Sequence, residues 1–157
     1  MPDKHLVLRD LHAAAEAVKS ELERLPADAA LWEPALGEWS QQQTLTHLHI
    51  CDHHIFLPRM VRVAQEENPH LPLVDEPEIM QQEWNPKRPR EELLAEFLIY
   101  REQELAVLEK ADWERPAVHA TRGPITLGWL ASYALSHTHE HLSQMMQVRL
   151  NYEVRQK

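Results

Sequence analysis

The sequence predicts an all-α protein that folds as a four-helix bundle with long crossover connections. Four segments carry apolar residues at the three- and four-residue spacing of an amphipathic helix, and proline or glycine separates them. Only 3 glycines occur in 157 residues, which argues against a sheet-rich fold that needs many tight turns. A chain of this length suits a single domain, 1–157, with one sizeable core.

The first two helices are expected over Lys4–Arg24 and Ser40–Glu67. The first ends before Pro26, and the second has a good N-cap residue in Ser40. Pro58 lies inside the second helix, where it removes one intrahelical hydrogen bond. We therefore expect the second helix to kink, or its regular part to end early.

The third and fourth helices follow a proline-rich connector, Asn68–Pro89, which is long enough to cross from one end of a bundle to the other. The third helix is expected over Arg90–Lys110. The fourth begins after Gly123-Pro124, with Thr126 as its N-cap, and runs to about Tyr152. Bundles of this kind build metal sites in the core, from side chains on facing helices.

The last helix carries the strongest functional signal, because His137 and His141 are four residues apart and share one helix face. They continue an apolar stripe that is expected to face the core. Its other members are Leu127, Leu130, Ala131, Ala134, Met145 and Val148. Two inward imidazoles need a partner, and a divalent cation satisfies both. The spacing therefore predicts a metal site.

A third ligand is expected from the second helix, which contains His47, His49, His53 and His54. His47 is preferred because it lies on the side of core positions, although the periodicity also permits His54. His49, His53 and His54 are interpreted as a polar helix face. Cys51, one turn after His47, is interpreted as a small apolar filler rather than a thiolate ligand or nucleophile.

Several sequence blocks are spread over most of the chain. They are Gly37-Glu38-Trp39-Ser40, Leu45-Thr46-His47-Leu48, Asp112-Trp113, Gly123-Pro124-Ile125-Thr126-Leu127 and the run from Ala134 to Met145 that contains Ser136-His137-Thr138-His139-Glu140-His141. In this order the blocks resemble the DinB/YfiT-like superfamily of metal-binding four-helix bundles. In that family, one histidine of the second helix and two histidines of the last helix bind a divalent metal. The resemblance places these ligands at His47, His137 and His141.

The chain departs from the commoner family pattern in its last helix. Members often have an aspartate directly after the first histidine and paired histidines at the end of the motif, where this chain has Thr138 and Glu140-His141. Residues next to the predicted metal ligands therefore differ from the commoner family pattern. Glu140, three residues after His137, is predicted to be catalytic, as the proton acceptor for a bound water.

The resemblance implies two kinds of enzyme: thiol-dependent transferases or isomerases, and metal-dependent hydrolases. A site of three neutral histidines has open positions, so its ion can activate water or a thiol. The expected cofactors are zinc or nickel, with iron and manganese as alternatives, and a low-molecular-weight thiol. Two other interpretations are a non-catalytic metal- or small-ligand-binding stress-response protein, and a structural bundle whose histidines happen to cluster.

The charge and hydropathy of the chain limit its partners. A formal net charge of -9 repels nucleic acid and anionic lipid, so we expect a small-molecule substrate instead. Neither a signal peptide nor a membrane-spanning apolar run is found, and Cys51 is the single cysteine, so a cytoplasmic location is expected. A second apolar stripe on the last helix predicts a homodimer. This stripe comprises Leu135, His139, Leu142 and Met146.

Overall fold

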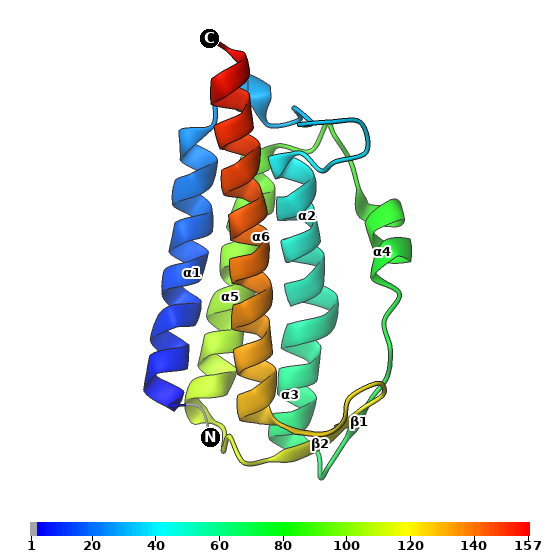
Figure 1. The fold of residues 1–157 in the computed structure, drawn as a ribbon. Coiled ribbons are helices and arrows are strands. Elements are labelled where there is room, and N and C mark those ends of the chain that lie inside the picture. The colour runs from blue at the N-terminus through cyan, green and yellow to red at the C-terminus, as the bar shows by residue number, and fades with distance from the viewer. Residues whose placement is uncertain (1–2) are drawn as a thin grey trace.

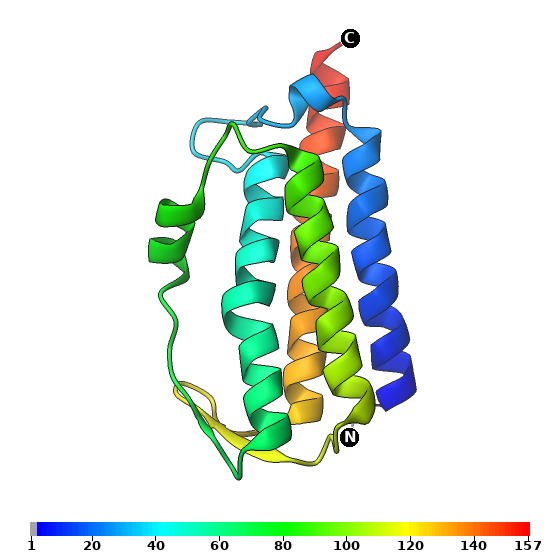
Figure 2. The same cartoon turned by 180° about the vertical axis from the view of Figure 1, so that it is seen from behind.

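A computed structural model describes residues 3–157 and shows a bundle of long helices (Figures 1 and 2). The helical elements are α1 (Lys4–Arg24), η1 (Ala27–Ala29), α2 (Gln41–Cys51), η2 (Asp52–Phe56), α3 (Leu57–Gln65), α4 (Glu76–Glu83), α5 (Arg90–Lys110) and α6 (Leu127–Arg155). The strands are β1 (His70–Leu71), β2 (Pro116–His119) and β3 (Gly123–Thr126). Because α2, η2 and α3 follow one another without a break, they act as one long helix. The predicted four-helix bundle is confirmed.

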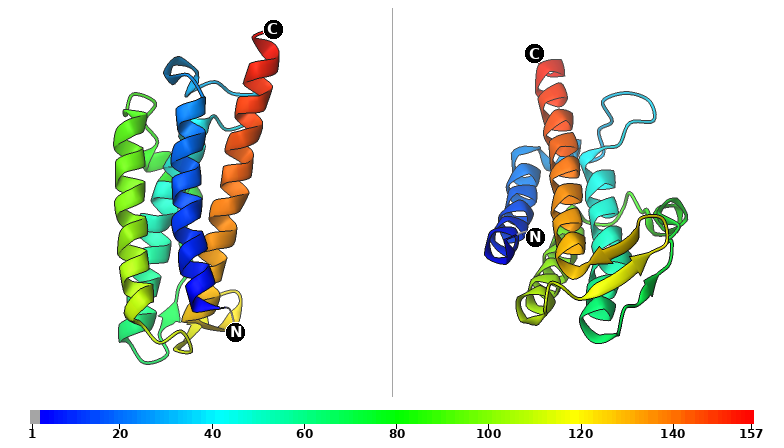
Figure 3. Two further views of the ribbon diagram at one scale, coloured as in Figure 1. Left: turned by 90° about the vertical axis from the view of Figure 1, so that its left-hand side faces the viewer. Right: turned by 60° about the horizontal axis from the view of Figure 1, so that its bottom comes forward.

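The long helices run in two directions. In Figure 1, α1 and α6 run upward, whereas the α2–α3 segment and α5 run downward. Both α1 and α2 pack against α5 and α6. The connector between α3 and α5 returns from one end of the bundle to the other, and it carries α4 along the outside of α2. The C-terminal end of α6 projects beyond the other helices (Figure 3).

The predicted helix boundaries agree closely with the structure. α1 and α5 have the predicted bounds, and α6 ends at Arg155, slightly beyond the predicted Tyr152. Ser40 caps α2 in a capping box, in which its hydroxyl accepts from the Gln43 N–H at 3.2 Å. Thr126 caps α6. The caps fix where the ligand-bearing helices α2 and α6 begin.

The interruption predicted at Pro58 is also present. The α-helical part of the second long helix ends at Cys51, a π-helical turn follows over Asp52–Phe56, and α3 has Pro58 in its first turn. Proline has no N–H and its ring crowds the carbonyl one turn earlier, so a wider turn before it relieves the clash. The chain keeps its direction while changing which side chains face the core.

The structure adds two features to the predicted connections. α4 lies in the Asn68–Pro89 connector, for which no helix was predicted; its cap, Asp75, accepts from the Glu78 N–H at 3.0 Å. β1, β2 and β3 form a small sheet in which β1 is parallel and β3 antiparallel to β2. Gly123, the first residue of β3, has a φ of 73° and follows the β2–β3 turn directly. The sheet covers one end of the bundle (Figure 3).

The core has two apolar clusters. One lies beside the sheet around Met60 and Trp113, and the other surrounds Leu48 and Phe97. The apolar stripe predicted for α6 is buried. Its buried apolar members are Leu127, Leu130, Ala131, Ala134, Met145 and Val148. His137 and His141 continue this stripe, so they too face the interior of the bundle.

A group of charged side chains is buried inside the bundle. Nη2 of Arg101 donates to Asp52 Oδ2 at 3.0 Å and to Thr138 Oγ1 at 2.9 Å. Nε of Arg101 lies 3.1 Å from Glu104 Oε2. Burial raises the pKa of the Asp52 and Glu104 carboxyls. This buried network joins η2, α5 and α6.

Within residues 3–157 no helix combines the length and the apolar character that spanning a bilayer requires. The second stripe of α6 is partly exposed: His139 and Met146 are exposed, and Leu135 and Leu142 are half-buried. The homodimer that this stripe suggests stays a prediction.

Candidate metal centre

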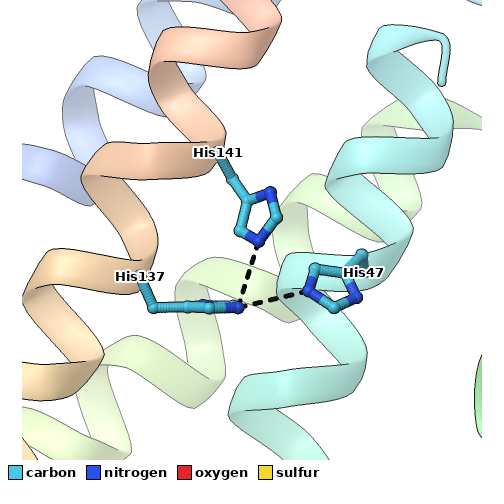
Figure 4. Close-up of side chains that lie close together, drawn as sticks. All are labelled: His47, His137 and His141. Atoms are coloured by element: carbon cyan, nitrogen blue, oxygen red, sulfur yellow. Dashed lines mark hydrogen bonds between the residues drawn. The ribbon is translucent and has the colours of Figure 1, made fainter. Parts of the chain in front are cut away.

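The structure brings together the three histidines that the sequence selected. His47 on α2 points toward His137 and His141 on α6 (Figure 4). Nε2 of His137 lies 3.2 Å from Nε2 of His47 and 3.1 Å from Nε2 of His141. His47 and His141 are each 8% exposed, and His137 is half-buried. The three nitrogens therefore converge on one point between two helices.

This arrangement fits a divalent ion. With metal–nitrogen distances of about 2.0–2.1 Å, two ligand nitrogens lie about 2.8 to 3.4 Å apart for angles between octahedral and tetrahedral. The two short Nε2 separations fall in this range. Nδ1 of His141 donates to Gln144 Oε1 at 2.8 Å, which leaves the Nε2 lone pair of the neutral ring free for a metal.

The surroundings also keep two of the rings neutral. Burial, and then the charge of His141, lower the pKa of His47 to about 4 and that of His137 to about 3. Neutral imidazole is the form that binds metals. Both rings are therefore ready to act as ligands at neutral pH.

The lowered pKa values predict how the metal-free protein responds to acid. In the unfolded chain these histidines return toward a pKa of 6.5, so between pH 6.5 and 4 the unfolded state binds more protons. The free energy of unfolding should then fall as the pH is lowered through this range, by up to about 1.4 kcal/mol per pH unit for each group. Urea denaturation at several pH values measures this change in the free energy of unfolding. The double variant His47→Gln, His137→Gln should show a shallower slope, and an equal slope would contradict this assignment.

Two further metal-binding side chains lie beside His47. Sγ of Cys51 is 3.5 Å from Nε2 of His47, and Oε2 of Glu76 is 3.9 Å from both atoms. Burial, and then the negative charge of Glu76, raise the pKa of the Cys51 thiol, so the thiol stays protonated. Glu76 was not foreseen, because no spacing along the chain links α4 to the histidine helices.

Other predicted site residues lie elsewhere. Glu140 is exposed on α6 and belongs to neither of the two groups of possible metal ligands found among residues 3–157. Its catalytic role stays a prediction. The interpretation of His49 as part of a polar helix face was wrong, since it is 3% exposed. Its Nε2 contacts Glu96 Oε2 at 2.7 Å, and this partner on α5 accounts for its burial.

Three cavities are each lined by one or two of the three histidines, and they differ in polarity. An apolar cavity of about 360 Å³ is lined by Trp39, His47, Glu76, Met80 and Trp84, among others. A polar cavity of about 520 Å³ is lined by residues including His47, His141, Gln144, Gln147 and Asn151. A basic cavity of about 190 Å³ is lined by residues including Arg59, His119, Arg122, Tyr133 and His137. The candidate metal position is therefore open to small molecules.

Comparisons with known proteins agree with this fold. YfiT from Bacillus subtilis, described as a probable metal-dependent hydrolase with an unusual four-helix bundle topology, matches with a TM-score of 0.79 and 20% identity over 92% of this chain and 85% of its own. TT2238, a four-helix bundle protein, matches with a TM-score of 0.61 and 21% identity over 90% of this chain and 96% of its own. No match was found among curated proteins. The sequence model of the DinB superfamily matches residues 10–145. The chain belongs to the DinB superfamily.

Proposed function

We propose that this protein is a metal-dependent hydrolase whose divalent ion is held by His47, His137 and His141. The observation that carries the proposal is the convergence of three Nε2 atoms whose rings line three cavities, with a carboxylate beside them. The description of YfiT as a probable metal-dependent hydrolase supports it. Imidazole ligands suit zinc or nickel, with iron and manganese as alternatives.

The three histidines supply neutral ligands, so a bound divalent ion keeps its full charge and acts as a Lewis acid toward water or a substrate oxygen. Glu76 is the proton acceptor. Its Oε2 atom lies 3.9 Å from Nε2 of His47, and its side chain lines both the apolar and the basic cavity. A carboxylate in this position takes the proton of the attacking nucleophile and returns it to the leaving group. Cys51 stays a neutral thiol.

Thiol transfer is the second candidate, and the separate cavities favour it. His47 and Glu76 line the apolar cavity, and His137 and Glu76 line the basic cavity. Two molecules, a thiol and an electrophile, can therefore approach the same centre. In this reaction Glu76 takes the thiol proton, and sulfur forms a bond to carbon as the leaving group departs.

The test uses protein loaded separately with zinc, nickel, manganese or ferrous iron. Hydrolysis of 4-nitrophenyl acetate and transfer of a small thiol to 1-chloro-2,4-dinitrobenzene are both measured. We expect Glu76→Gln to lower kcat by about 100-fold or more while the bound metal is retained, because a positioned proton acceptor contributes about that much. Glu78→Gln, an exposed glutamate of the same helix, is the control.

Two outcomes would contradict the proposal. If Glu140→Gln loses activity while Glu76→Gln stays active, Glu140 and not Glu76 is the catalytic residue. Fully loaded protein that turns over neither probe with any of the four metals would favour a metal-binding protein without catalytic function.

A further inference from the structure

We infer that the substrate carries an anionic oxygen group, a carboxylate or a phosphate, which binds between Arg59 and Arg122 in the basic cavity. The inference rests on the proposed function, since it places the reacting part of the same molecule at the histidines. Arg59 and Arg122 line this cavity together with His137 and Glu76.

Arg59, on α3, is a buried cation without a carboxylate partner. It is 9% exposed, and it forms no ion pair among residues 3–157. Its Nη1 group contacts Nε2 of His119 at 3.3 Å, and its Nη2 group donates to the Pro72 carbonyl at 2.7 Å. A guanidinium has five N–H donors, so donors remain for a ligand in the cavity. Buried charges are normally paired, and a bound anion would supply the missing partner.

His119 holds Arg59 without neutralising it. Nδ1 of His119 accepts from the Thr121 N–H at 3.3 Å and lies 3.2 Å from Thr121 Oγ1, while Nε2 lies 3.3 Å from Nη1 of Arg59. Burial lowers the pKa of His119, and the positive charges of Arg59 and Arg122 lower it further. The imidazole is therefore neutral, and the positive charge of the guanidinium is not compensated from this side.

Arg122 supplies the second charge from the β2–β3 turn. Its guanidinium carbon lies 5.0 Å from the ring centre of Tyr133 and 5.4 Å from that of Trp129. These aromatic rings orient the guanidinium but leave its charge in place. Arg122 likewise forms no ion pair with a carboxylate in the described part of the chain. Arg59 and Arg122, neither of which forms an ion pair in the described part of the chain, therefore share one cavity in a protein whose net charge is -9, and Glu76 is the carboxylate whose charge reaches Arg59.

The charge distribution along the cavity gives the ligand a direction. The two guanidinium groups and the Glu76 carboxylate line the same cavity, and Glu76, whose Oε2 lies 3.9 Å from Nε2 of His47, repels an anion. An anionic group is therefore held away from Glu76, and the remainder of the molecule extends toward His137. A cavity of about 190 Å³ admits only a small anionic group.

Binding to the metal-free protein tests this site separately from the metal chemistry. Inorganic phosphate and acetate are titrated into the full chain, and the shifts of the arginine side-chain N–H signals are followed by NMR. We expect Arg122→Gln to weaken binding by about 10-fold or more, in line with the contribution of a charge-assisted hydrogen bond. Arg122→Lys should retain part of the affinity for the anion. Arg59→Lys, checked for folding by circular dichroism, should weaken binding because a lysine has no planar fork.

The control is Arg155→Gln, since Arg155 also lies over an aromatic ring, that of Trp32, but far from the cavity. Binding of phosphate alone would assign phosphate esters as substrates, and binding of acetate alone would assign carboxylates. Binding that is equally strong in wild type and Arg122→Gln, or no binding of either anion to wild type, would overturn the inference. The outcome of this anion titration does not depend on whether the metal-loaded protein is catalytic.

Discussion

Replacing any one of His47, His137 and His141 with alanine is expected to abolish tight metal binding. Removing a residue that only orients a ligand already costs about 10–100-fold in affinity, and the loss of a ligand costs more. Elemental analysis of untagged protein after exhaustive dialysis should find near-stoichiometric metal in the wild type and almost none in each variant. Catalytic activity should be lost in parallel.

The matched control is His139→Ala, because His139 is exposed on α6 between the two ligand positions. This variant should retain its metal. Wild-type protein that stays empty when offered zinc, nickel and manganese would contradict the metal site, and so would a triad variant that binds metal as tightly as wild type.

Arg101→Met is expected to destabilise the fold by about 3–5 kcal/mol, the typical cost of removing one partner of a buried ion pair. Arg101 and Asp52 are each 1% exposed, and Glu104 is completely buried. Without the guanidinium, both carboxyl groups lose their buried counter-charge, and Thr138 loses a hydrogen bond. Urea denaturation of the metal-free protein at pH 7 measures the change in the free energy of unfolding.

Arg62→Met serves as the comparison for this substitution. Arg62 pairs with Glu66 one helical turn away on an exposed surface, where such pairs contribute less than about 1 kcal/mol. A triple variant with apolar residues at 52, 101 and 104 should recover much of the lost stability, because no charge is then left buried. A loss below about 1 kcal/mol in Arg101→Met would contradict the account of the network.

The helices were largely predictable because their signals are local. The start of α2 depends on Ser40 and Gln43, which are three residues apart, and the interruption of the second helix depends on Pro58 alone. His137 and His141 share a face through the pitch of one helix. For His47, the choice over His54 needed the resemblance to a family, and the structure brings His47 to the other two.

The rest of the site depends on contacts between distant segments. Glu76 reaches His47 only because the connector folds α4 onto α2, and a proline-rich sequence gave no sign of that packing. Arg59, His119 and Arg122 meet only after the β2–β3 hairpin folds against α3. The burial of His49 depends on Glu96 of α5. The periodicity of apolar residues within one segment does not predict contacts between residues of distant segments.

The most direct test of the central claim is anomalous diffraction from crystals of the zinc-loaded protein, recorded at the zinc absorption edge. The account predicts one strong peak at about 2.1 Å from the Nε2 atoms of His47, His137 and His141. A peak at another site, such as one bound by Cys51 and Glu76 without the α6 histidines, would contradict it. Fully zinc-loaded protein without a peak at the triad would contradict it equally.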